Sequence, residues 1–138
     1  MTYRHIPTDV FLKDARDIKK DYPEFGNDLK GMRKRLSRLS SFKNQSDIDD
    51  LGHGLFKLRL EITGKLGSKS YGARIIFFFI TTDREIWYLT CYDKSDTKNI
   101  TQQEIKRIRK LTDQIVSTSP LVTRLEKFGS VTLGRLKK

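Results

Sequence analysis

The feature that most constrains the fold of this chain is an unbroken apolar run from Ile75 to Ile80. A strand that carries no polar residue on either face lies in the middle of a sheet whose two faces are both covered. The polar turn Thr82 to Glu85 follows, and so short a connection forces the next apolar stretch, Ile86 to Tyr92, to return antiparallel. The sequence therefore predicts a sheet organised around the strand at residues 73–81.

The strand before this run is predicted to be buried on one face only. From Phe56 to Ile62, apolar residues alternate with charged ones, which is the period of a half-buried strand. Lys57 and Arg59 are two positions apart, so their side chains leave the sheet on the same side and can act on one ligand. More cations follow in the glycine-rich loop and at the start of the apolar strand: Lys65, Lys69 and Arg74. This cluster suits the phosphates of a nucleic acid better than a small neutral substrate.

Helical periodicity appears on both sides of these strands. Apolar residues recur at helical spacing over residues 8–21, 26–39 and 101–115, and a short fourth helix is expected at 121–129. Thr8 is the expected N-cap of the first helix, and Thr101 to Glu104 matches a capping box. Tyr3 to Ile6 is expected to form a short strand, and residues 40–54 a polar connecting loop. This order predicts an α+β fold, with two N-terminal helices packed on a small, mainly antiparallel sheet and one or more C-terminal helices.

Length and charge limit the possible classes of protein. A chain of 138 residues with periodic apolar positions is the size of one domain and is not a disordered chain. The net charge of +11 points to nucleic acid, an acidic protein or an anionic membrane as partner. The chain has no apolar run long enough to cross a bilayer, and its first residues lack the apolar core of a secretion signal. A cytoplasmic protein without a membrane partner is therefore expected.

The sequence predicts neither a metal site nor a cofactor. Cys91 is the one cysteine, which excludes an internal disulfide and a multi-cysteine metal site. Three carboxylates lie close together in the polar segment, at Asp47, Asp49 and Asp50. They lack the glycine and terminal glutamate of a calcium-binding loop, so we expect them to shape a loop or turn.

Three segments of the chain also carry a recognisable pattern. They are Gly54-Leu-Phe-Lys-Leu-Arg-Leu, Gly64-Lys-Leu-Gly-Ser-Lys-Ser-Tyr-Gly-Ala-Arg-Ile-Ile-Phe-Phe-Phe, and Tyr92-Asp-Lys-Ser-Asp-Thr-Lys-Asn-Ile-Thr. In this order they resemble the RelE/HigB superfamily of bacterial toxins, and its HigB-like branch most of all. The resemblance covers about Asp9 to Leu111. It implies a twisted sheet behind two helices, and a single toxin domain over residues 1–138 with 113–138 as a C-terminal extension.

The resemblance also implies a function. Members of the superfamily are endonucleases that cut messenger RNA in the decoding site of the ribosome. They are held inactive by an antitoxin encoded beside them, which in the HigB branch is commonly a helix-turn-helix protein. Carried onto this chain, the resemblance implies an RNA-contacting and catalytic set of Lys57, Arg59, Arg74, Tyr92 and Lys94.

Such residues can cut RNA without a metal, because the 2′-hydroxyl next to the scissile phosphate is the nucleophile. Arg59 and Arg74 would stabilise the dianionic phosphorane with bidentate hydrogen bonds. A lysine crowded among cations has a lowered pKa, which makes Lys57 or Lys94 a candidate proton acceptor or donor. Tyr92 could stack on a base or donate a proton. The cations expected to follow the RNA backbone are Lys65, Lys69 and Lys98.

One departure from the family and two other functions stay open. Some members place a histidine or a tyrosine at the end of the last strand or in the terminal helix as general acid. The histidines of this chain are His5, in the first strand, and His53, in a Gly-His-Gly turn. A loop histidine such as His53 is more often structural than catalytic. The alternatives are a toxin of the same fold that acts on DNA gyrase, as ParE does, and a nucleic-acid-binding protein without catalysis.

Overall fold

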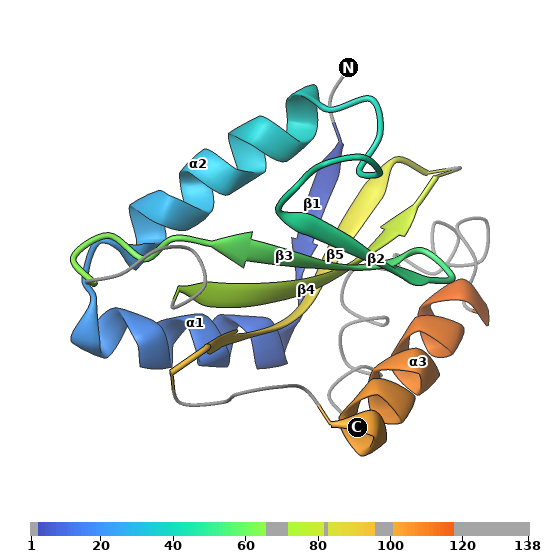
Figure 1. Ribbon diagram of the computed structural model, residues 1–138. Helices are drawn as coiled ribbons and strands as arrows, with labels where there is room; N and C mark the ends of the chain where they lie inside the picture. The colour runs from blue at the N-terminus through green and yellow to red at the C-terminus, as the bar shows by residue number, and fades with distance from the viewer. Residues whose placement is uncertain (1–2, 66–71, 82, 96–100, 118–138) are drawn as a thin grey trace. The chain divides into compact units, whose positions relative to one another are not determined.

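The computed structural model describes residues 3–65, 72–81, 83–95 and 101–117. The chain divides into two compact units, Met1–Lys98 and Asn99–Lys138. The first unit contains a five-stranded sheet with the strand order β1-β5-β4-β3-β2 (Figure 1). Its strands are β1 (Arg4–Pro7), β2 (Ile48–Gly52), β3 (Leu55–Leu60), β4 (Ala73–Ile80) and β5 (Glu85–Asp93). The predicted α+β fold is confirmed.

The apolar run forms β4, which lies in the middle of the sheet as predicted. It pairs antiparallel with β3 on one side and β5 on the other, and its residues from Ala73 to Phe78 are buried. A bulge between Ile76 and Phe77 shifts its register against β5. Because successive side chains of a strand point to opposite faces, Arg74 lies on the face opposite to its neighbours Ala73 and Ile75.

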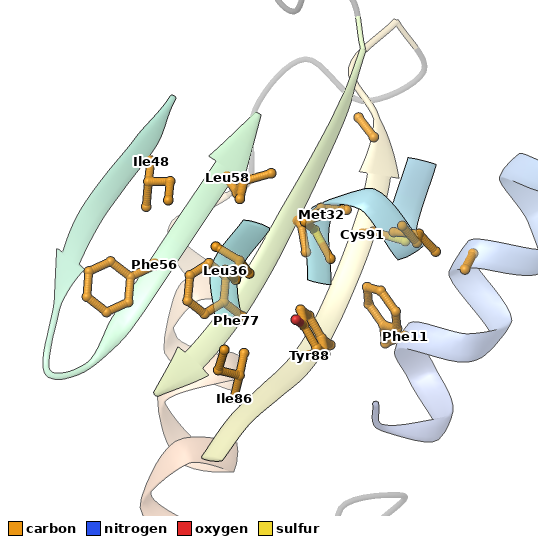
Figure 2. Packing of buried hydrophobic residues seen from close by; sticks show 14 of the residues in the cluster. Phe11, Met32, Leu36, Ile48, Phe56, Leu58, Phe77, Ile86, Tyr88 and Cys91 are labelled. Atoms are coloured by element: carbon orange, nitrogen blue, oxygen red, sulfur yellow. The ribbon is translucent and has the colours of Figure 1, made fainter. Parts of the chain in front are cut away.

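Helices α1 (Asp9–Asp21) and α2 (Phe25–Arg38) build the core on one face of the sheet. Thr8 caps α1 as predicted: its Oγ1 accepts a hydrogen bond from the Phe11 N–H at 3.2 Å. The helices and strands share one buried cluster, in which Phe11 of α1 and Met32 and Leu36 of α2 pack with the strand residues (Figure 2). The core therefore fixes which face of the sheet the helices cover.

The prediction of a connecting loop over residues 40–54 is wrong in part, because the segment contains β2. This edge strand pairs antiparallel with β3 through a turn in which Gly52, His53 and Gly54 all have positive φ. Aspartates are depleted in strands, but an edge strand tolerates them because one of its sides faces solvent. The first strand, β1, pairs parallel with β5, so the sheet is mainly rather than wholly antiparallel.

The second unit contains helix α3 (Gln102–Ser117). Its predicted capping box is confirmed: the Glu104 N–H donates to Thr101 Oγ1 at 3.1 Å, and the Thr101 N–H donates to Glu104 Oε1 at 3.2 Å. The predicted fourth helix at 121–129 lies outside the described residues. In the described part of the chain, every helix is too short or too polar to cross a membrane.

Candidate active site

Three neighbouring strands bring cationic side chains to one face of the sheet. Arg59 of β3 lies opposite Arg74 of β4, and Arg74 lies opposite Tyr92 of β5. Residues paired in this way hold their Cβ atoms about 5 Å apart on the same face. Lys57 shares that face because it is two positions before Arg59 on β3. The sheet therefore gathers four of the residues that the sequence singled out, on the face opposite α1 and α2.

Arg74 is the most buried member of this group, with 6% of its surface exposed. Its Nη1 donates a hydrogen bond to the Ala73 carbonyl at 3.3 Å. Nearby, Gly72 lets the start of β4 pass close to the end of β3, since a Cβ at Gly72 would lie 2.3 Å from the Leu60 carbonyl oxygen. The glycine thus permits the strand approach that brings Arg74 beside Arg59.

The pairing of Arg59 with Arg74 is electrostatically unfavourable, because like charges directly opposite each other destabilise a sheet. Burial lowers the pKa of the Arg74 guanidinium, the nearby Tyr92 and Asp49 raise it, and the Arg59 charge lowers it. An arginine nevertheless stays protonated in a protein. The site therefore holds two fixed positive charges side by side, which is the arrangement that a phosphate can neutralise.

Lys94 follows β5 directly and joins the group. Its backbone N–H donates to the Gly72 carbonyl at 2.9 Å, which holds the end of β5 beside the start of β4. Desolvation, followed by the charges of Arg74 and Lys57, lowers the pKa of the Lys94 ammonium. We call Lys57, Arg59, Arg74 and Lys94 the cationic site.

Asp49 of β2 contacts two residues of the cationic site, although the sequence predicts this aspartate to lie in a loop. It lies opposite Lys57 in the β2–β3 register. Its Oδ2 is 3.4 Å from Arg59 Nη1 and 3.9 Å from Lys57 Nζ. The Arg59 Nη2 also donates to the Ser46 carbonyl. The Gly-His-Gly turn was the available signal, because a hairpin at that turn places Asp49 across from Lys57.

Lys65, which is expected to follow RNA, lies apart from the cationic site. Its ammonium forms an ion pair with the Asp93 carboxylate and donates to Ser95 Oγ at 2.7 Å, and its side chain is only 12% exposed. Burial alone would raise the pKa of Asp93, but hydrogen bonds from Lys65 and Ser95 hold that pKa below its ordinary value. Lys65 therefore fastens the loop after β3 to the end of β5.

The other residues considered from sequence lie elsewhere. Lys69 and Lys98 are outside the described residues. His53 is exposed in the β2–β3 turn, at the far end of β3 from Arg59, and a strand of this length separates the two by roughly 20 Å. His5 lies on β1, where its ring nitrogens bond to Tyr88 Oη at 2.8 Å and Ser37 Oγ at 2.7 Å. Neither histidine is part of the cationic site.

The arrangement is suited to binding and stabilising a phosphodiester. Two guanidinium groups can hydrogen-bond the non-bridging oxygens, and two ammonium groups add charge beside them. Lys57 and Arg59 have side chains that are 24% and 30% exposed, so each is reachable and still shielded from bulk water. Partial shielding strengthens their attraction for an anion.

Fold and site together define a small, basic α+β protein with a cluster of cationic side chains on one face of its sheet. The family model of the RelE toxin of the RelE/RelB toxin–antitoxin system matches residues 30–129. The chain belongs to this family of toxins, and its partner is accordingly an antitoxin. Among solved structures, it is similar to the E. coli toxin RelE, as an arginine double mutant in the free state, with 16% identity and a TM-score of 0.48. That match covers 78% of this chain and 99% of the other, while a comparison with curated proteins found no match.

Proposed function

We propose that this toxin is a ribosome-dependent endoribonuclease that cuts messenger RNA in the cytoplasm. The observation that carries the proposal is the convergence of Lys57, Arg59, Arg74 and Lys94 from neighbouring strands. Like charges directly opposite each other lower the stability of a sheet, and an anionic ligand bound beside them would offset that cost. RNA fits because its phosphates are anionic and its 2′-hydroxyl supplies the nucleophile.

In the proposed reaction, the 2′-hydroxyl attacks the adjacent phosphorus and forms a 2′,3′-cyclic phosphate. Arg59 and Arg74 hydrogen-bond the non-bridging oxygens and stabilise the charge that accumulates in the phosphorane. Lys94 accepts the proton of the 2′-hydroxyl, because it joins the site at the end of β5 and because desolvation and the charges of Arg74 and Lys57 lower the pKa of its ammonium. Lys57 adds positive charge at the phosphate, and Tyr92 stacks on a base next to the scissile bond. The bond between phosphorus and the 5′-oxygen breaks, the 5′-oxygen takes a proton from solvent water, and no metal is needed at any step.

We further infer that the protein belongs to the HigB-like branch, with a helix-turn-helix antitoxin. The support is the order of motifs, in which Lys57 and Arg59 precede a glycine-rich loop and Tyr92 and Lys94 precede a helix. Lys69 and Lys98 remain in the proposed RNA-contacting set, and Lys65 does not because of its ion pair with Asp93.

The test is cleavage of messenger RNA by purified protein on programmed ribosomes, mapped by primer extension. Arg59→Glu should lower the cleavage rate at least about 1,000-fold, because it removes one phosphorane-stabilising group and adds a repelling charge. Lys20→Glu is the matched control, since the Lys20 side chain is 77% exposed on α1 and far from the sheet face concerned. Circular dichroism of both variants checks that they are folded.

Three results would contradict the proposal. If Arg59→Glu cuts as fast as the parent protein, the cationic site is not the catalytic centre. If expression stops growth without any cut inside translated codons, the protein acts on another target, and inhibition of DNA gyrase supercoiling becomes the assay to run. Tight RNA binding without cleavage or growth inhibition would instead indicate a non-catalytic nucleic-acid-binding protein.

A further inference from the structure

A groove runs between α1 and α2, on the helix-covered side of the sheet. Its volume is about 690 Å³. The floor is apolar and consists of Phe11, Ala15, Leu29 and Met32, all buried. At its mouth lies Leu12, which is 40% exposed; among the described residues, only Leu12 and Val10 are large hydrophobic side chains with such exposure. An exposed apolar side chain beside an apolar groove favours contact with another apolar group.

The rim of this groove is uniformly positive. It is formed by Arg16 and Lys19 of α1 and by Lys30 and Arg33 of α2, and no carboxylate lines it. Within the described part of the chain, none of these four cations forms an ion pair. An anionic partner would therefore not have to break existing pairs.

The acidic residues of α1 are kept away from this rim. Asp14, Asp17 and Asp21 line a separate depression together with Cys91 of β5. Asp14 is also engaged there, because it accepts a hydrogen bond from Thr90 Oγ1 at 2.7 Å. Helix α1 thus presents Arg16 and Lys19 toward the groove and these three carboxylates toward β5, so the carboxylates do not neutralise the rim.

The combination of features identifies the chemistry of the occupant. A phosphate backbone would use the cations but would leave Leu12 and the apolar floor without a partner. An amphipathic helix with an apolar stripe and flanking carboxylates uses both, because it places apolar side chains into a groove and acidic ones against the rim.

We propose that the groove between α1 and α2 binds an acidic amphipathic helix of the antitoxin. The proposal rests on membership of a toxin–antitoxin family, which supplies the protein partner. The docking surface lies on the side of the sheet opposite the cationic site, and the two surfaces share no residue. Antitoxin binding and RNA cleavage can therefore be damaged separately by substitution.

The experiment measures binding of a synthetic helical peptide by fluorescence anisotropy. The peptide has leucines at i, i+4 and i+7 with glutamates beside them, and a second peptide has the same composition in scrambled order. The wild-type protein should bind the amphipathic peptide at least about tenfold more tightly than the scrambled one. The double variant Arg16→Glu with Lys30→Glu should lose at least about tenfold in affinity, and Leu12→Ser about fivefold.

Lys13→Glu is the matched control for the charge reversals, since Lys13 is exposed on α1 and does not line the groove. The double variant should keep its rate of RNA cleavage, whereas Arg59→Glu should keep peptide binding and lose cleavage. If the proposed nuclease function is wrong, the cleavage assay shows this and the peptide-binding assay is unaffected.

Equal binding of the two peptides, or wild-type affinity in the double variant, overturns the docking site. Loss of polyuridylate binding or of cleavage in the double variant overturns it as well and makes the groove a nucleic-acid contact.

Discussion

Asp47, directly before β2, and Asp49, within β2, are two residues apart, yet their ion pairs with arginine differ in geometry. Asp47 receives both terminal nitrogens of Arg35, at 2.6 and 2.8 Å, and its side chain is 9% exposed. Asp49 uses one oxygen for two cations, Arg59 at 3.4 Å and Lys57 at 3.9 Å, and its side chain is 44% exposed. The first pair is short and bidentate and has a buried carboxylate, and the second is long and shared.

The difference separates charges that stabilise the fold from charges available to a ligand. Arg35 and Asp47 are matched one to one, and the pair ties the last turn of α2 to the residue before β2. The Asp47 carbonyl also accepts the Arg59 N–H at 2.9 Å, so this pair supports the strand that carries the cationic site. In the cationic site, the carboxylate of Asp49 is shared between the charges of Arg59 and Lys57. A phosphate can supply further negative charge there and has no role at the matched pair.

After Arg59→Glu, the largest effect is expected at Lys94, where desolvation and then the charges of Arg74 and Lys57 lower the pKa of the ammonium. A lysine that accepts a proton must be neutral, so the cleavage rate should rise with pH and level off at a pKa below the ordinary value of 10.5. Lys94→Arg keeps the charge but cannot become neutral, so it should lower the rate about 100-fold and abolish that rise. The measurement is the single-turnover rate on programmed ribosomes across the pH range, with Lys20→Arg as the charge-conserving control. An unchanged pH profile in Lys94→Arg would remove Lys94 from the role of base.

The next effect is expected at the matched pair. Asp47→Asn leaves Arg35 without its carboxylate and should lower the free energy of unfolding by about 2 kcal/mol, less than for a fully buried pair because the Arg35 side chain is 39% exposed. Cleavage per folded molecule should change little, since neither side chain belongs to the cationic site. Urea unfolding followed by circular dichroism measures the first quantity. A large loss of cleavage with normal stability would show that the two regions are not separate.

The elements that sequence reasoning predicted well are those in which periodicity decides the structure. The run from Ile75 to Ile80 could only be a central strand, and the Thr101 capping box could only begin a helix. The strand β2 was missed because its aspartates oppose strand formation, and its pairing depends on a turn with three successive residues at positive φ.

The membership of the site was harder to predict, because lysines with equal charge are equivalent in a sequence. Lys57 and Lys65 are eight positions apart, and both are expected to contact RNA. In the structure, Lys65 forms an ion pair with Asp93, whereas Lys57 is 3.9 Å from the Asp49 carboxylate. The choice depends on where the loop after β3 meets the end of β5, which is a tertiary contact. Alternation alone placed Lys57 and Arg59 on one face, whereas their meeting with Arg74 required the register between β3 and β4.

The smallest expected effect sharpens the comparison most, because it concerns Asp49 itself. Asp49→Asn removes a negative charge that competes with a phosphate for Arg59 and Lys57. The free energy of unfolding should stay within about 0.5 kcal/mol of wild type, since the contacts are long and partly exposed. RNA affinity should rise about threefold, which corresponds to a weak exposed ion pair being replaced by phosphate. Binding of a short single-stranded RNA at several salt concentrations measures this change.

Asp50→Asn is the matched control for Asp49→Asn, because Asp50 is the next residue and its side chain is 41% exposed. Its contacts are with Lys43 at 3.9 Å and with the Gly52 N–H at 2.8 Å, outside the cationic site. Asparagine retains an oxygen for the Gly52 N–H, so neither stability nor RNA affinity should change appreciably. If Asp49→Asn instead costs as much stability as Asp47→Asn and leaves RNA affinity unchanged, Asp49 is a structural partner like Asp47. The availability of Arg59 and Lys57 to a phosphate would then need another explanation.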